Sequence, residues 1–164
     1  MSGTVGTIDA LAAELVVSFG RRGVVVATAE SCTGGLIAAS ITDVPGSSAV
    51  LDRGFVTYSN AAKMEMLGVE EETLMKHGAV SREVAAQMAE GALAASHADV
   101  AVAVTGVAGP DGGSAGKPVG LVHFARAGRS GPTRSEHHVF SGDRAAIRRA
   151  TVRRALELLM EVTA

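Results

Sequence analysis

Two short runs of small and β-branched residues constrain the fold of this chain more than any other feature, and they occupy residues 24–29 and 100–104. A strand with one face in water alternates polar and apolar residues, whereas a strand covered on both faces stays apolar along its length. Runs this short also have the length of strands rather than of buried helices. The two runs therefore predict central strands of a mainly parallel sheet with helices on both sides.

Apolar residues recur at helical spacing around these strands. Three long helices are expected: one capped by Thr7, one capped by Ser81, and one from about Asp143. Asn60 can cap a shorter helix that carries Lys63. Further strands are expected at residues 54–58, 119–125 and 136–140, the last two as an antiparallel pair. This order predicts an α/β fold, a three-layer α/β/α sandwich with a mainly parallel, mixed sheet of about five strands.

The length of 164 residues fits a single domain over residues 1–164 with an independent core. A net charge of −2 and an aromatic content of 3% argue against nucleic acid as a ligand. The single cysteine excludes an internal disulfide, and the scattered histidines lack the spacing of metal ligands. No apolar stretch of the sequence is long enough to span a bilayer. We therefore expect a cytoplasmic protein without a metal, a nucleic-acid partner or a membrane.

Unusual residues follow three of the expected strands at their carboxyl ends. Glu30 and Ser31 follow the first, Tyr58 and Lys63 follow the second, and Thr105 ends the third. In open α/β sheets, ligands bind in the crevice beyond these ends. If the three strands are parallel neighbours, the residues meet at one site. This convergence predicts a functional site more strongly than any single segment does.

Ser31 belongs to the segment Ala-Glu-Ser-Cys-Thr-Gly-Gly at residues 29–35, which joins a strand to a helix. Its hydroxyl can act as a nucleophile, and the N–H groups beside Gly34 and Gly35 can hold an anion. A serine at such a place is more often a helix cap. Glycines weaken a helix, however, and a cap does not need them. Close approach of the backbone to a ligand does need them, so they favour a functional site. Cys32 is expected to face the interior, opposite Ser31.

Lys63 and Tyr58, each taken alone, are most simply a solvated lysine and a packed core tyrosine. Lys63 can accept the serine proton only if burial or a nearby cation lowers its pKa well below about 10.4. A catalytic pair also requires Ser31 Oγ and Lys63 Nζ to lie within about 3 Å of each other. Their distance therefore tests the prediction.

The glycine-rich segment at 105–113 contains neither a Gly-x-Gly-x-x-Gly pattern nor a phosphate loop, which excludes the standard dinucleotide and triphosphate sites. Its N–H groups can bind a single phosphate, or the segment is a surface turn, and the local sequence favours neither. Arg144 and Arg148, one helical turn apart, can clamp a phosphate or a carboxylate, although exposed charge is the commoner explanation.

Six ordered segments of the chain resemble those of the CinA C-terminal domain family, and the resemblance extends from residue 8 to residue 162. They are residues 29–35, 58–60 with Lys63, 78–81, 105–110, 117–120, and 142–144 with Arg148. One departure is Ala61, where many relatives have an acidic residue, and it touches no expected catalytic role.

The resemblance implies an amidohydrolase that converts nicotinamide mononucleotide and water into nicotinate mononucleotide and ammonia, within pyridine nucleotide salvage. It implies Ser31 as the nucleophile, Lys63 as its base and Tyr58 as an assisting hydroxyl, with no metal or organic cofactor, in a homo-oligomer. Larger members carry an N-terminal domain resembling molybdopterin-binding proteins, which we expect this chain to lack. Two alternatives stay open: a non-enzymatic binding module associated with competence or DNA damage, and a serine–lysine hydrolase of another amide or ester.

The substrate is expected to contact the strand ends and the last helix. The N–H groups of Thr33 and Gly34 are expected to stabilise the oxyanion, and the Thr105 loop or the two arginines to hold the phosphate. The residues expected to bind substrate are Glu30, Thr33, Gly34, Gly35, Thr105, Gly106, Gly109, Arg144 and Arg148.

Overall fold

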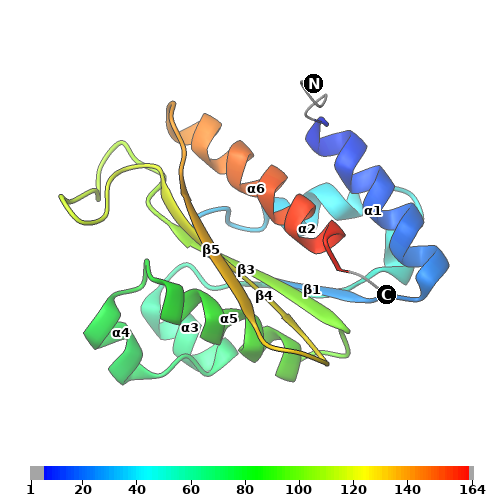
Figure 1. Ribbon diagram of the computed structural model, residues 1–164, viewed down its shortest axis with the longest axis horizontal. Coiled ribbons are helices and arrows are strands. Elements are labelled where there is room, and N and C mark those ends of the chain that lie inside the picture. Colours follow the sequence, from blue (N-terminus) through cyan, green and yellow to red (C-terminus); the bar gives the residue numbers. More distant parts are fainter. Residues whose placement is uncertain (1–5, 163–164) are drawn as a thin grey trace.

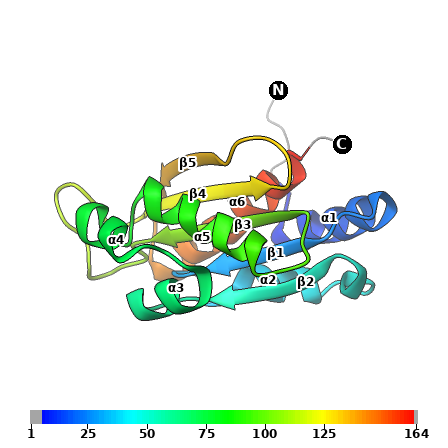
Figure 2. The same ribbon diagram turned by 90° about the horizontal axis from the view of Figure 1, so that it is seen from below.

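The computed structural model describes residues 6–162 and contains one five-stranded mixed sheet with the strand order β2-β1-β3-β4-β5 (Figure 2). Strand β1 pairs in parallel with both β2 and β3, whereas β4 runs antiparallel to β3 and β5. The strands are β1 (Val26–Glu30), β2 (Leu51–Val56), β3 (Val100–Gly106), β4 (Leu121–Gly128) and β5 (Arg134–Val139). The expected α/β fold, with its mixed sheet and antiparallel last pair, is confirmed.

Helices cover both faces of the sheet (Figure 1). One layer contains α1 (Ile8–Arg22), α2 (Leu36–Thr42) and α6 (Arg144–Met160), and the other contains α3 (Asn60–Leu67), α4 (Glu71–His77) and α5 (Arg82–Ala94). The side chains of Thr7 and Ser81 accept hydrogen bonds from the N–H groups three residues on, as the sequence predicts, and Asp143 caps α6 in the same way. Among the described residues, no helix is long and apolar enough to cross a membrane.

The central strand β3 divides the interior into two unlike cores because valine and alanine alternate along it. Val100, Val102 and Val104 pack in the core formed with α1, α2 and α6. Ala101 and Ala103 pack in the core formed with α3, α4 and α5. Successive side chains of a strand point to opposite faces, so this alternation gives α5 a flat surface on which to pack closely.

Strand β2 ends before the residues predicted for it. It covers Leu51–Val56 rather than residues 54–58, because it pairs with β1 alone and the ladder ends where Val56 meets Glu30. Tyr58 consequently leaves the sheet. Ser59, not Asn60, caps α3 by accepting a hydrogen bond from the Ala62 N–H. These shifts place Lys63 in the first turns of α3, facing inward.

Helix α3 is held against α5 at one glycine. A methyl group on Gly91 would overlap the main chain of Leu67 at the end of α3, so only glycine allows this approach. The contact fixes the position of the helix that carries Lys63.

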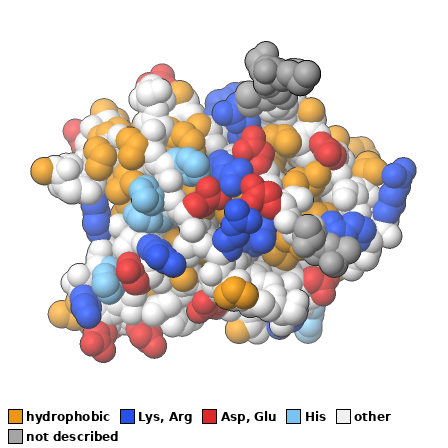
Figure 3. Space-filling model, in the orientation of Figure 1, with side chains coloured by type: hydrophobic (Ala, Val, Ile, Leu, Met, Phe, Trp, Pro, Cys, Tyr) orange, Lys and Arg blue, Asp and Glu red, His pale blue; other side chains and the backbone are white. Residues whose placement is uncertain are grey.

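The arginines of the last third of the chain do not form a free basic surface. Arg154 contacts the carboxylates of Glu136, Glu157 and Glu161 at 2.7, 3.3 and 2.9 Å, and Arg134 contacts Glu161 at 3.0 Å. Figure 3 shows positive and negative side chains gathered together on this face. The interleaved signs are typical of a structural ion-pair cluster rather than of a nucleic-acid surface.

Candidate active site

Ser31 lies directly after β1, where its backbone N–H still donates to the Val104 carbonyl of β3 at 3.1 Å. Its side chain is nearly buried. The Lys63 Nζ, from α3, lies 3.0 Å from the Ser31 Oγ. The predicted proximity of the two groups is confirmed, while their roles in catalysis stay a prediction.

Lys63 is 1% exposed, and its Nζ has two further partners, the carbonyl of Thr57 at 2.8 Å and that of Tyr58 at 3.5 Å. No carboxylate lies within salt-bridge distance of it among residues 6–162. Burial therefore lowers the pKa of Lys63 below its ordinary value of 10.5, because the lost hydration of the ammonium outweighs the opposing effect of Cys32. A neutral amine that donates to both carbonyls directs its lone pair at the Ser31 hydroxyl.

Cys32 is buried, as predicted, although it also contributes to the lining of the pocket beside Ser31. Burial raises the pKa of its thiol to about 11, so the sulfur stays protonated near neutral pH. The structure favours Ser31 over Cys32 as the nucleophile.

The side chains of Ser31 and Lys63 line a pocket of about 200 Å³ beyond the carboxyl ends of the three parallel strands. Segments that are far apart in the sequence form its walls. The lining residues are Ser31, Cys32, Tyr58, Asn60, Lys63, Ala79, Val80, Thr105, Gly106, Ala108 and Arg144. The predicted convergence of three strand ends is therefore confirmed.

Glu30 and the side chain of Thr33 do not line this pocket, which corrects the prediction of Glu30 as a substrate-binding residue; the role of the Thr33 N–H stays a prediction. The Glu30 carboxylate is fully buried and accepts hydrogen bonds from the Thr33 hydroxyl at 2.6 Å and from the N–H groups of Ile37 and Ala38 at 2.8 and 3.1 Å. Ile37 and Ala38 lie in the first turn of α2, and the N-cap residue Gly35 has no side chain that could accept from their N–H groups. Glu30 thus caps α2 and fixes the turn at residues 31–35, which we call the serine turn.

Gly34 is likewise misassigned as an oxyanion donor. Its N–H donates to the Ser31 carbonyl at 3.1 Å, closing the turn. Gly34 and Gly35 have φ values of 59° and 104°, a conformation that other residues rarely adopt. Both glycines are required by the turn itself, and neither lines the pocket.

The two arginines of α6 do not form a joint clamp. Arg144 lines the pocket and donates to the Gly109 carbonyl at 2.7 Å and to the Tyr58 hydroxyl at 3.2 Å. Arg148 donates instead to the carbonyls of Cys32 and Thr33, each at 3.1 Å, and lies outside the pocket. The structure corrects the prediction that Arg148 binds substrate.

Tyr58 stands at the mouth of the pocket, with its side chain 64% exposed. Its hydroxyl faces Arg144, and among the described hydrogen bonds none joins it to Ser31 or Lys63. Its carbonyl, not its hydroxyl, contacts the Lys63 amine. Its role as an assisting hydroxyl stays a prediction.

Thr105 and Gly106 line the pocket from β3. The Thr105 hydroxyl donates to the Ala79 carbonyl at 2.9 Å and so ties β3 to the loop between α4 and α5. A side chain on Gly106 would strike Val122 of β4. Gly109 takes part only through the carbonyl that accepts from Arg144.

Five lining residues were not predicted as site residues: Cys32, Asn60, Ala79, Val80 and Ala108. Ala79 and Val80 belong to one of the segments that carry the family resemblance, which was the only signal for them. Their place depends on how α4 and α5 pack against the sheet, which no local pattern gives.

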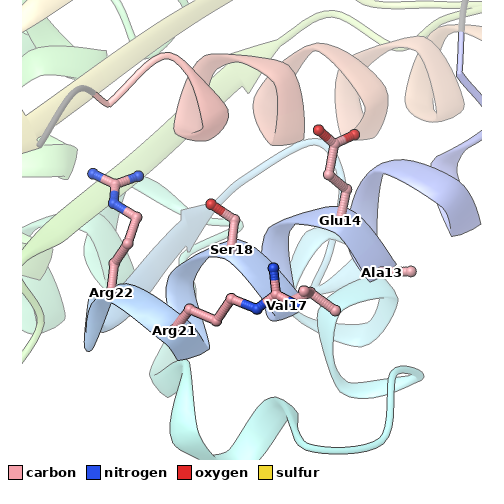
Figure 4. Close-up of a pocket in the computed structure, with 6 residues that line it drawn as sticks. All are labelled: Ala13, Glu14, Val17, Ser18, Arg21 and Arg22. Carbon is pink, nitrogen blue, oxygen red and sulfur yellow. The ribbon is translucent and has the colours of Figure 1, made fainter.

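A second, more open depression of about 580 Å³ lies on the outer face of α1 and is lined by Ala13, Glu14, Val17, Ser18, Arg21 and Arg22. Figure 4 shows that Arg21 and Arg22 point in different directions and do not converge on one point. The residues that line it include no nucleophile paired with a base. In residues 6–162, no group of three metal-ligating side chains occurs either.

Comparison with known proteins identifies the family. Residues 8–163 match the CinA C-terminal domain. The chain belongs to this family. This CinA domain is 57% identical over 140 residues to the protein named nicotinamide-nucleotide amidohydrolase PncC of Escherichia coli K12, covering 85% of each chain. It is 59% identical over 138 residues to the protein of that name in Enterobacter agglomerans, covering 84% of each.

A solved structure has the same fold as this CinA domain. It is the competence/damage inducible protein CihA from Agrobacterium tumefaciens, which is 56% identical to the chain and superimposes with a TM-score of 0.93 over 98% of both chains. The arrangement of the sheet and its helices is thus shared with a determined structure of the family.

Proposed function

We propose that this protein hydrolyses the carboxamide of nicotinamide mononucleotide to give nicotinate mononucleotide and ammonia. The observation that carries the proposal is the contact of 3.0 Å between Ser31 Oγ and Lys63 Nζ in a pocket at the end of the sheet. The names of relatives at 57% and 59% identity support this substrate. A binding module has no need of a buried amine directed at a serine hydroxyl.

The first step acylates Ser31. Its oxygen forms a bond to the carboxamide carbon, its proton passes to the neutral Lys63, and one electron pair of the C=O bond moves to the oxygen. The oxyanion then re-forms the C=O bond as the C–N bond breaks. Lys63 returns the proton to the leaving nitrogen, so ammonia departs and the acyl group stays on Ser31.

Water completes the reaction by the same path. Lys63 takes one proton from a water molecule whose oxygen attacks the ester carbon. When the resulting intermediate breaks down, the Ser31 oxygen leaves and regains a proton from Lys63. The products are the free serine and a carboxylic acid. No proton relay is required, because the amine contacts the serine hydroxyl directly.

We place the substrate in this site with its carboxamide toward Ser31. A pocket of about 200 Å³ accepts the carboxamide and part of the ring, while the sugar and phosphate extend toward the mouth. Arg144 lies there, with its guanidinium held by the Gly109 carbonyl and the Tyr58 hydroxyl. We assign the phosphate to Arg144, since a fixed guanidinium suits a phosphate oxygen.

The decisive assay measures ammonia released from nicotinamide mononucleotide by the purified protein. We expect Ser31→Ala and Lys63→Ala each to lower kcat by about 10³-fold or more, because each removes one member of a reacting pair. Lys76→Ala is the matched control, since this lysine of α4 is exposed. Activity that survives in both variants contradicts the mechanism. A wild type inactive on this substrate contradicts the function, and turnover of another amide then supports the broader hydrolase.

A further inference from the structure

Arg148 contacts the serine turn from the side of the sheet opposite to Lys63. From helix α6, its Nε donates to the carbonyl of Cys32 at 3.1 Å and its Nη2 to the carbonyl of Thr33 at 3.1 Å. These partners lie 116 and 115 positions away in the sequence. One planar guanidinium thus fixes two consecutive peptide groups, which a lysine amine cannot do with the same geometry.

Fixing a carbonyl also fixes the N–H group of the same peptide. In a trans peptide the C=O and N–H bonds point in opposite directions, and the one cis bond among the described residues is Gly109–Pro110. Because the Cys32 carbonyl faces Arg148, the Thr33 N–H points away from that guanidinium and from α6. It donates to no protein group in the part of the chain that the structure describes.

Two neighbouring groups of the turn are already engaged. The Gly34 N–H donates to the Ser31 carbonyl at 3.1 Å, and the Thr33 hydroxyl donates to Glu30 at 2.6 Å. The turn is therefore held at its side chain by Glu30 and at its carbonyls by Arg148. The Thr33 N–H is left as a donor whose direction these contacts set.

We propose that Arg148 is a positioning residue that orients the Thr33 N–H to stabilise the oxyanion formed when Ser31 attacks. The inference rests on the proposed function, since it concerns the transition state of that reaction. Donors aimed in advance at a developing negative charge are among the largest contributions to catalysis. Arg148 acts through the backbone and does not touch the substrate, unlike Arg144.

The test compares Arg148→Ala and Arg148→Lys with wild type on nicotinamide mononucleotide and on nicotinamide riboside, which lacks the phosphate. We expect Arg148→Ala to lower kcat by about 10–100-fold on both substrates, with little change in KM, because a displaced donor acts in the transition state. Arg148→Lys keeps the charge but not the double contact, so it restores only part of the rate. Arg149→Ala, an exposed neighbour on α6, is the control.

A second measurement does not depend on the substrate. A fluorophosphonate forms a tetrahedral adduct on an activated serine, and mass spectrometry gives the rate of Ser31 labelling. We expect slower labelling in Arg148→Ala and partial recovery when guanidinium is added. If Arg148→Ala does not fold, as judged by circular dichroism, the same rates measured on Arg148→Lys decide the question.

Two results overturn the inference: labelling of Ser31 at the wild-type rate in both variants, or a loss of activity confined to the phosphorylated substrate. The second would make Arg148 a phosphate ligand. A wild type that labels at Ser31 but releases no ammonia contradicts the proposed function alone, and slower labelling of the variants then still supports the role of Arg148.

Discussion

At the scale of single residues, the site depends on how a lysine can be buried beside a serine. Lys63 is almost fully buried, and its amine contacts two carbonyls and the Ser31 hydroxyl rather than a carboxylate. A carboxylate partner would favour the ammonium strongly, whereas neutral carbonyls do so only in part, and burial lowers the pKa of Lys63. The arrangement therefore increases the share of the neutral amine, which is the form able to accept a proton.

This environment predicts the pH dependence of the reaction. Because burial lowers the pKa of Lys63 and only the neutral amine is active, kcat/KM should rise with pH and level off above that lowered pKa, below the ordinary value of 10.5. A pH–rate profile checks this. If kcat/KM is still rising at pH 10.5, Lys63 is not the titrating base.

Stability should follow the same titration. Between the lowered pKa of Lys63 in the folded protein and 10.5 in the unfolded chain, the unfolded state binds more protons, so the free energy of unfolding rises with pH. Urea unfolding at several pH values should show this rise in wild type and lose it in Lys63→Met. Equal pH dependence in both proteins would contradict the assignment.

Tyr58 provides a separate prediction because its hydroxyl contacts Arg144 at 3.2 Å. Tyr58→Phe should raise KM for nicotinamide mononucleotide by about tenfold or less and leave kcat nearly unchanged, since one hydrogen bond to a charged group is lost. Steady-state kinetics measure both constants. A fall in kcat of about 10² or more would instead support the assisting hydroxyl.

At the scale of elements, the close packing of α3 on α5 holds Lys63 in place. Gly91→Ala introduces a methyl group against the Leu67 main chain, so we expect a loss of about 1–3 kcal/mol of stability together with reduced activity. Chemical denaturation and the ammonia assay measure the two effects. The same substitution at Gly20 of α1 is the control.

Gly20 has open space around the position of a Cβ atom and lies in a helix. Gly20→Ala should therefore stabilise the protein by up to about 1 kcal/mol through helix propensity. If Gly91→Ala stabilises the protein as Gly20→Ala does, the contact between α3 and α5 does not constrain the site.

At the scale of the whole molecule, the two cores differ in the size of their side chains. Valines of β3 face α1 and α6, whereas its alanines face α5. The alanine face brings α3 and α5 close to the sheet, and that face also holds the Ser31–Lys63 contact. The architecture thus places the reactive pair on the alanine side of the sheet.

We also propose that the protein assembles as a homo-oligomer. Light scattering after size-exclusion chromatography should give a multiple of the chain mass of 16.6 kDa. As a control for weak association, the protein is diluted to nanomolar concentration and its activity is measured in parallel. A single species of 16.6 kDa at all concentrations would contradict this proposal.

The sequence alone determined the features that depend on neighbours along the chain. Periodicity predicted the α/β fold, short polar side chains before two long helices predicted the caps at Thr7 and Ser81, and parallel strands implied that Ser31 and Lys63 would meet. These inferences succeed because strand direction and helix capping are set within a few residues.

Only the tertiary structure decided which polar groups remain available to a substrate. Glu30 and Arg148 have the residue types of ligand-binding groups, yet both are occupied by the serine turn, and Tyr58 turns its hydroxyl to Arg144. The physical reason is that buried donors and acceptors must find partners, and those partners are brought near by the packing of α2 and α6 rather than by local sequence.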